Sequence, residues 1–137
     1  MRNLVVVIVL VILGCGNAYC QSKRVIKEHK IKLVKSYEQD IVQGEKELLL
    51  EKEEYFDENG ELIEEKKFDE KGRVKGWKKF AFNEAGKLVE EQELNYRGDV
   101  VKRIEYKYSN GLLVEKSYYD NKNRKYKLKR YEFQFAK

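Results

Sequence analysis

Six copies of one short pattern decide the fold of this chain. The clearest copies read Phe56-Asp57-Glu58-Asn59-Gly60, Phe68-Asp69-Glu70-Lys71-Gly72 and Phe82-Asn83-Glu84-Ala85-Gly86. Each is an aromatic residue, an Asp or Asn, two variable residues and a Gly. The later copies are looser and read Leu94-Asn95-Tyr96-Arg97-Gly98, Tyr108-Ser109-Asn110-Gly111 and Tyr119-Asp120-Asn121-Lys122-Asn123. Successive turn ends lie 12, 14, 12, 13 and 12 residues apart, a period that predicts one strand and one turn in each unit.

The residue types in the pattern fit a specific turn. Asp or Asn at the first turn position can accept hydrogen bonds from backbone N–H groups two residues on. Gly at the last position adopts the left-handed conformation without steric cost, and Asn123 replaces it in the sixth copy. The pattern therefore predicts consecutive hairpins, each closed by a type I turn and a glycine bulge. The alternative, a charged helical chain, is disfavoured because a Gly about every 12 residues would break its helices.

The segments between the turns predict an all-β fold, an antiparallel meander of about eight strands in one twisted sheet that can curl over its own apolar face. Residues 25–38 and 45–56 are predicted as two long strands, with an amphipathic helix as the rival for the first. The other predicted strands span residues 61–68, 73–82, 87–94, 100–108, 112–119 and 125–135. Their middles are charged, so we expect cross-strand ion pairs and only a modest core. Aromatic side chains are expected to supply most of the buried area, namely Trp77, Phe80, Phe82, Tyr106, Tyr108, Tyr118, Tyr126, Tyr131 and Phe133.

The N-terminus has the pattern of an export signal. Arg2 precedes an unbroken apolar run over residues 4–13, which is too short to span a membrane and fits the apolar region of a secretory signal. Residues 1–20 are therefore predicted to be a leader and residues 21–137 a single β-repeat domain. Two processing sites compete, and an uncleaved anchor is a third reading. Residues 12–15 resemble a lipobox, at which Cys15 would be lipidated, and Ala18-Tyr19-Cys20 suits ordinary cleavage after Cys20.

Cysteine usage and charge limit the function classes. The chain has two Cys residues, and neither processing route leaves a pair for a disulfide or a thiol centre in the mature domain. The formal net charge is +5, and removal of Arg2 with the leader makes it +4. Because the signs are mixed along the chain, we expect weak overall fields. The destination is predicted to be the periplasm, the outer membrane surface or the medium, with membrane contact only through an N-terminal lipid.

The repeated pattern resembles two families of bacterial repeat proteins. The aromatic-Asp-x-x-Gly-x-Leu-Ile pattern resembles the YD (Rhs-type) repeats of exported proteins. Gly76-Trp77 and the run Gly86-Lys87-Leu88-Val89-Glu90-Glu91 resemble the MORN-like repeats of some antitoxin-type proteins. Both likenesses imply tandem β-hairpins over roughly residues 55–123, and they bear on fold much more than on activity.

No residue set predicts catalysis, a cofactor or a metal site. His29 is the only histidine, so a His-dependent triad or His-rich metal site lacks partners. Adjacent Glu residues in a strand point to opposite faces, although a glycosidase pair could still form across strands. The Asp57 and Asp69 loops are too short for an EF-hand. We therefore expect a protein that is not an enzyme.

The strongest candidate for binding is a set of aromatic and basic residues. Such interleaving can stack on a ligand and contact anions, and export makes an acidic glycan, a lipid headgroup or a partner protein more plausible than nucleic acid. The alternative for the C-terminal segment is a closing edge strand, in which lysine discourages unwanted pairing. The expected function is an exported, non-catalytic interaction or structural module of the bacterial envelope. Alternatives are a glycan-active enzyme with cross-strand carboxylates and an immunity-like protein that binds a toxin. The candidate residues are Trp77, Tyr106, Tyr108, Lys125, Tyr126, Lys127, Lys129, Arg130 and Tyr131.

Overall fold

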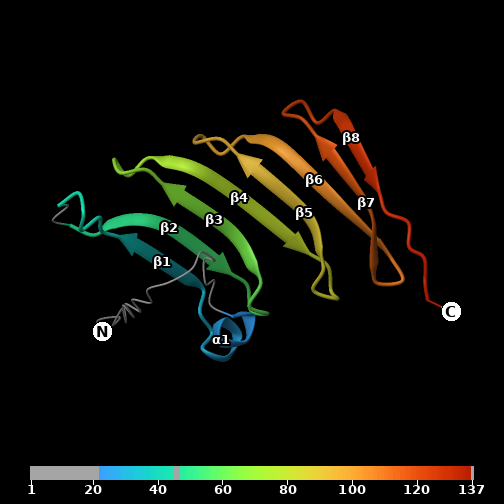
Figure 1. Ribbon diagram of the computed structural model, residues 1–137, viewed down its shortest axis with the longest axis horizontal. Coiled ribbons are helices and arrows are strands. Elements are labelled where there is room, and N and C mark those ends of the chain that lie inside the picture. The colour runs from blue at the N-terminus through green and yellow to red at the C-terminus, as the bar shows by residue number, and fades with distance from the viewer. Residues whose placement is uncertain (1–21, 45–46, 137) are drawn as a thin grey trace.

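The computed structural model describes residues 22–44 and 47–136, so the predicted leader, with Cys15 and Cys20, lies outside the described residues. Within these described residues, one helix, α1 (Lys23–Glu28), precedes a single sheet of eight strands (Figure 1). The strands are β1 (Leu33–Glu38), β2 (Leu49–Phe56), β3 (Leu62–Phe68), β4 (Val74–Phe82), β5 (Leu88–Leu94), β6 (Val100–Ser109), β7 (Leu112–Tyr119) and β8 (Lys125–Arg130).

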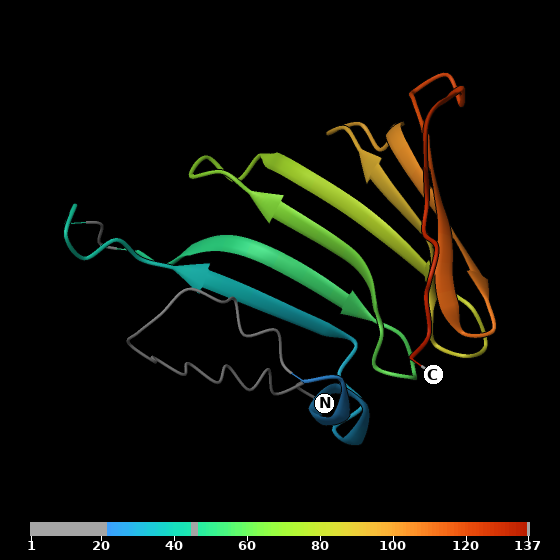
Figure 2. The ribbon, with the colours of Figure 1, turned by 45° about the vertical axis from the view of Figure 1, so that its right-hand side comes forward.

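The sheet is an open antiparallel meander, as the turn pattern predicts. Its strand order is the order of the sequence, from β1 at one edge to β8 at the other. Figure 2 shows that the strands near β8 are turned steeply relative to those near β1, which is the accumulated twist expected of a many-stranded sheet. Within residues 22–44 and 47–136, no layer of helices covers either face of the sheet.

Five of the six turns have the predicted chemistry. The fifth differs, because Asn110 and Gly111 alone join the paired residues Ser109 and Leu112, and both have left-handed φ values, 49° and 78°. In the first repeat, the Gly60 N–H donates to the Asp57 carbonyl at 3.0 Å, and the Asp57 Oδ1 accepts from the Asn59 and Glu61 N–H groups at 2.9 Å each. Gly60 has φ +79°, and Asn123 holds the corresponding left-handed position of the sixth copy with φ 59°. The same side-chain and backbone bonds recur at most of the other turns.

Every strand pair also contains a one-residue register shift. In the last hairpin, Tyr118 lies opposite Lys127 and Tyr119 lies opposite Lys125, so Tyr126 is left without a partner. Such a bulge increases the local twist and changes which side chains share a face beyond it. The shifts therefore decide which charges meet across the sheet.

The predicted strand over residues 25–38 is wrong in its first half, where α1 forms. The Ser22 side chain caps the helix by accepting from the Val25 N–H at 3.4 Å, and the helix buries Ile26 completely. Lys30 then takes a left-handed φ of 51°, which ends the turn before β1. Burial of one apolar residue at the hairpin end thus outweighs the β-branched composition that favoured a strand.

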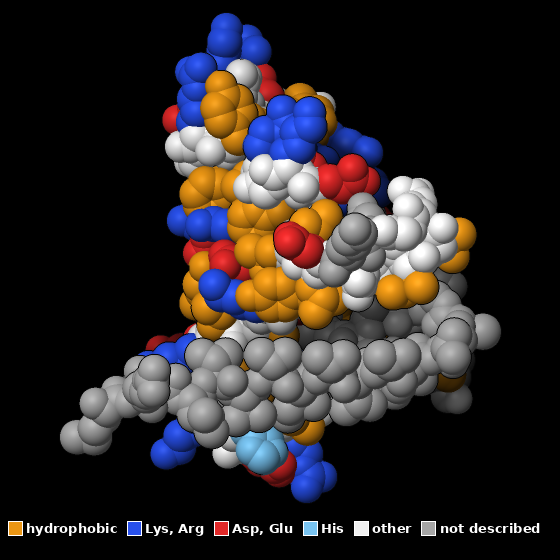
Figure 3. All heavy atoms as spheres, turned by 90° about the vertical axis from the view of Figure 1, so that its left-hand side faces the viewer, with side chains coloured by type: hydrophobic (Ala, Val, Ile, Leu, Met, Phe, Trp, Pro, Cys, Tyr) orange, Lys and Arg blue, Asp and Glu red, His pale blue; other side chains and the backbone are white. Residues whose placement is uncertain are grey.

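The core is modest, as predicted, but its buried residues are not the aromatic residues that were expected to form it. Among the described residues, the buried apolar side chains are Ile26, Phe56 and Leu94. The aromatic residues predicted to form the core are half-buried or exposed, with Tyr126 56% and Phe133 45% exposed. A one-layer sheet has no second layer that could cover them. Figure 3 shows hydrophobic side chains interleaved with charged ones on one side of the molecule.

The last predicted strand is too long. It was expected to reach residue 135, but β8 ends at Arg130. Beyond it, the Tyr131 N–H still donates to the Val114 carbonyl at 3.0 Å, and residues 132–136 continue without strand pairing.

Candidate functional site

The strand registers assign the strand side chains to two faces. One face, here called the Trp77 face, carries Lys66, Trp77, Arg103 and Tyr119. The opposite face, here called the Tyr106 face, carries Lys78, Tyr106 and Tyr118, among others.

On the Trp77 face, a lysine lies between two aromatic rings. The Lys66 Nζ is 4.3 Å from the Trp77 ring centroid and 5.9 Å from that of Tyr55. The Trp77 Nε1–H donates to Glu64 at 2.7 Å, and Tyr55 donates to Glu53 at 2.9 Å. Each polar atom of the two rings is thus satisfied within the sheet, and the cluster leaves little bonding capacity for a ligand.

A second cluster on the same face centres on Arg103. Its guanidinium lies 4.0 Å from the Tyr119 ring centroid, 3.3 Å from the Glu90 carboxylate, and also contacts Glu105. Tyr119 donates to Glu105 at 2.7 Å. The hydrogen bonds from Tyr119 and Arg103 lower the pKa of Glu105 despite the opposing effect of burial.

Glu90 and Glu105 are direct cross-strand partners, and they line an open hollow on this face. The hollow has a volume of about 580 Å³ and also includes Glu115, Ser117 and Lys125. This hollow is the described site that most resembles the predicted alternative, a glycan-active enzyme with two facing carboxylates in a concave site. Glu90 and Glu105 both pair with Arg103, and Glu115 pairs with Arg130 at 3.3 Å.

The Tyr106 face carries a different arrangement near β8. The Lys116 Nζ lies 5.1 Å from the Tyr106 ring centroid, and the Lys127 and Lys129 Nζ atoms lie 5.2 and 6.0 Å from that of Tyr118. Tyr126 stands beside Tyr118, with ring centroids 6.3 Å apart. We call the group the lysine platform; it consists of Tyr106, Lys116, Tyr118, Tyr126, Lys127 and Lys129.

The platform tyrosine nearest the sheet centre is fixed by a carboxylate. The Tyr106 hydroxyl donates to Glu91 at 3.1 Å, and Glu91 also pairs with Lys78 at 3.1 Å. Burial, with the Glu91 charge, raises the pKa of Tyr106. Tyr106 therefore stays protonated at neutral pH and positions its ring under Lys116.

The charge balance of the platform sets it apart from the rest of the sheet. The described strands contain four like-charged cross-strand pairs: Lys52/Lys67, Glu54/Glu65, Glu90/Glu105 and Lys116/Lys129. The first two pairs neutralise each other, since Lys52 contacts Glu54 at 3.0 Å and Lys67 contacts Glu65 at 3.6 Å.

Arg103 neutralises the third like-charged pair, Glu90/Glu105. For the fourth, no carboxylate within residues 22–44 and 47–136 lies at ion-pair distance from Lys116 or Lys129. Like charges directly opposite each other destabilise a sheet. The Lys116/Lys129 pair thus keeps an electrostatic repulsion that opposite charges neutralise at the other three pairs.

The structure brings together only part of the predicted binding set. Tyr106, Tyr126, Lys127 and Lys129 meet in the platform. The others are elsewhere: Trp77 in the Lys66 cluster, Lys125 over Tyr119 on the Trp77 face, Tyr108 bonded to the Leu88 carbonyl at 2.8 Å, Arg130 paired with Glu115 at 3.3 Å, and Tyr131 beyond β8.

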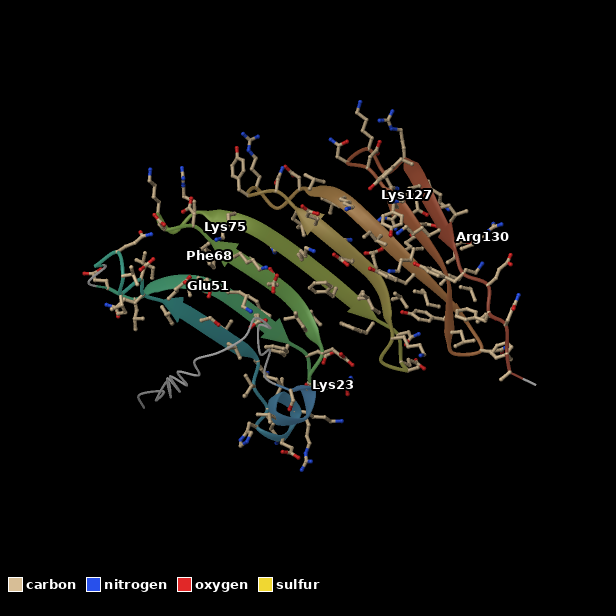
Figure 4. All side chains as sticks on the ribbon, in the orientation of Figure 1. Lys23, Glu51, Phe68, Lys75, Lys127 and Arg130 are labelled. Atoms are coloured by element: carbon tan, nitrogen blue, oxygen red, sulfur yellow. The ribbon has the colours of Figure 1, made fainter. Side chains whose placement is uncertain are left out.

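Two platform residues, Lys116 and Tyr118, were missing from the predicted binding set. Figure 4 places the labelled Lys127 and Arg130 on β8, at the end of the sheet opposite Lys23 of α1. A period-two reading of β7 beside β8 would have put Lys116 and Tyr118 on one face. Their pairing with the β8 lysines depends on the register shift at Tyr126, which lies three residues after the left-handed turn residue, as in the other repeat hairpins. The predicted turns and strands did not include this shift.

Comparison with known proteins adds no assignment. The chain matches no protein-family model and no curated protein. Within residues 22–44 and 47–136, no group of three His, Cys, Asp or Glu side chains is arranged to hold a metal ion, and His29 is exposed. In the same part of the chain, the helix is too short and polar to be a candidate for membrane crossing.

Proposed function

We propose that this chain is an exported, non-catalytic interaction module that binds an anionic partner through the lysine platform. The observation that carries the proposal is the uncompensated Lys116/Lys129 pair, with Lys127 beside it, on tyrosine rings. An anion seated there would relieve the repulsion and accept charge-assisted hydrogen bonds, which are stronger than neutral ones. The export part of the proposal rests on the apolar leader of residues 4–13.

The shape of the sheet supports binding over catalysis. Among the described residues, no second layer packs on either face of the sheet, and several of its carboxylates form ion pairs with lysine or arginine. Such a surface can contact an extended partner without a conformational change in the sheet. The lysine platform, with Lys127 on β8, lies at the edge of the sheet remote from α1 (Figure 4).

The second candidate function is a glycan hydrolase that uses Glu90 and Glu105 in the hollow of the Trp77 face. A hydrolase of this kind needs one carboxyl with a raised pKa to act as general acid. Arg103 and Tyr119 act in the opposite direction on Glu105. The geometry therefore supports the interaction module better.

The test measures binding of two anionic probes, an oligoglutamate peptide and an oligogalacturonate, to the full chain. The double variant Lys116→Gln/Lys129→Gln is compared with Lys71→Gln/Lys75→Gln, which removes the same charge from two exposed lysines outside the platform. Two lost charge-assisted contacts are expected to weaken binding by the platform variant at least about tenfold. Failure of both probes to bind, or an equal loss in the two variants, would contradict the proposal.

A further inference from the structure

The outer edge of β8 offers free backbone groups next to the lysine platform. β8 is the last strand of the sheet, so one of its edges pairs with β7 and its outer edge pairs with no described strand. Because the Tyr131 N–H donates toward β7, the period-two alternation of a strand turns the N–H and C=O groups of Leu128 and Arg130 outward. All six residues of β8 are exposed.

The side chains of β8 are sorted by face. Lys127 and Lys129 lie two residues apart on the Tyr106 face, without a carboxylate partner among the described residues. Leu128 and Arg130 lie on the Trp77 face, where Arg130 is already paired with Glu115 at 3.3 Å. An added strand would thus meet unpaired positive charge on one face and an apolar side chain, Leu128, on the other.

We propose that the β8 edge accepts an extended strand of an acidic partner protein, whose carboxylates at alternate positions lie over Lys127, Lys129 and Lys116. An added strand has the same two-residue side-chain period as β8. Its acidic residues therefore reach the platform while its backbone pairs with the outward groups of Leu128 and Arg130. This inference rests on the proposed function and specifies the chemical class of its partner.

Charge complementarity selects this occupant over a second copy of the chain. β8 contains four cations and no acid among its six residues, so two β8 edges would repel each other. Lysine on an edge strand is a common protection against pairing with strands in general. The same lysines attract a strand whose side chains on the Tyr106 face are acidic, so the edge would favour such a strand over neutral or basic ones.

The probe is a peptide that alternates Glu and Val over six residues, and its control has the same composition with three Glu followed by three Val. The first is expected to bind the full chain at least about tenfold more tightly, because only alternation puts every carboxylate on one face. In the bound chain, the amide hydrogens of Leu128 and Arg130 should become protected from exchange. Equal affinity for the two peptides would overturn the inference.

A pair of variants separates backbone pairing from side-chain contact. Leu128→Pro removes an outward N–H that β7 does not use, a substitution that edge strands tolerate. Leu128→Ala keeps this N–H and removes the apolar side chain. We expect Leu128→Pro to lose at least about tenfold in affinity and Leu128→Ala to stay within about threefold. Protection of the Tyr131 amide in the free variant verifies that β8 is still formed.

The outcomes distinguish this inference from the proposed function. Loss of binding in Lys116→Gln/Lys129→Gln, with no effect of Leu128→Pro, would refute strand addition and leave the platform as an anion site. Binding of oligogalacturonate but not of the alternating peptide would do the same and identify a glycan ligand. Binding of neither probe would overturn both.

Discussion

Replacement of Gly60 by alanine should cost more than the same change at Gly72, although both glycines hold the same turn position. Their φ values are +79° and +73°, so each variant bears the left-handed strain of about 1–2 kcal/mol. A Cβ at Gly72 would meet nothing within 4 Å, whereas one at Gly60 would lie 2.7 Å from the Lys23 carbonyl oxygen. The Gly60 variant must therefore also displace α1.

The additional cost follows from what α1 buries. Ile26 is fully buried, and burial of such a side chain is worth about 1.5–3 kcal/mol. Gly72→Ala is thus expected to lose about 1–2 kcal/mol of unfolding free energy, and Gly60→Ala up to about 2.5–5 kcal/mol. Urea denaturation measures both values, and amide exchange at Ile31, whose N–H donates to the Ile26 carbonyl, reports on α1 directly.

A double-mutant cycle tests the mechanism. Ile26→Ala alone should cost about 2–5 kcal/mol, but little in the Gly60→Ala background, because α1 has already left its site. Equal losses at Gly60 and Gly72, or additive effects of Gly60→Ala and Ile26→Ala, would refute the reasoning that the turn and the helix are in steric contact.

Two further predictions concern charge within the sheet. Asp69 accepts hydrogen bonds from the Arg73 N–H and side chain, and these bonds lower the pKa of Asp69 in the folded chain. The ionised Asp69 therefore stabilises the fold above its unfolded-state pKa of about 3.9. This stabilisation is lost as the pH falls through the lower pKa of the folded state. Asp69→Asn should therefore flatten the decline in the urea midpoint below about pH 4, and an unchanged pH profile would speak against it. Arg103→Gln leaves Glu90 facing Glu105 without a cation, so we expect a loss of about 1–2 kcal/mol that high salt partly recovers; a loss insensitive to salt would argue for a packing effect instead.

The turns were predictable because their chemistry is local. A short Asp or Asn side chain and a left-handed Gly or Asn specify the turn without reference to the rest of the chain. Strand β7 was predicted with its observed bounds, and β3 to within one residue at its start. The wrong first half of residues 25–38 is different in kind, since α1 lies with Lys23 and Lys27 against the Gly60 turn, which is distant in sequence, and buries Ile26.

The lysine platform was only partly predictable. Without the register shift in the last hairpin, Lys116 would lie opposite Leu128; with it, Lys116 lies opposite Lys129. A shift of one residue exchanges the faces of a strand. The shift at Tyr126 follows the left-handed Asn123 by three residues, as the shifts of the other repeat hairpins follow their turn glycines, but the turn pattern alone did not predict it. The basic and aromatic composition of β8 could be read from the sequence, whereas the β7 residues that lie opposite its lysines are known only from the strand register.

The number of repeating hairpins also determines the width of the sheet. Each strand pairs only with its neighbours in sequence, and α1 and the lysine platform lie at opposite ends of the series. Neighbouring strands are about 4.8 Å apart, so adding or deleting two repeats would move β8 by about 10 Å relative to α1 without rebuilding a shared core. The number of repeats therefore sets how far the chain can reach from its N-terminal end.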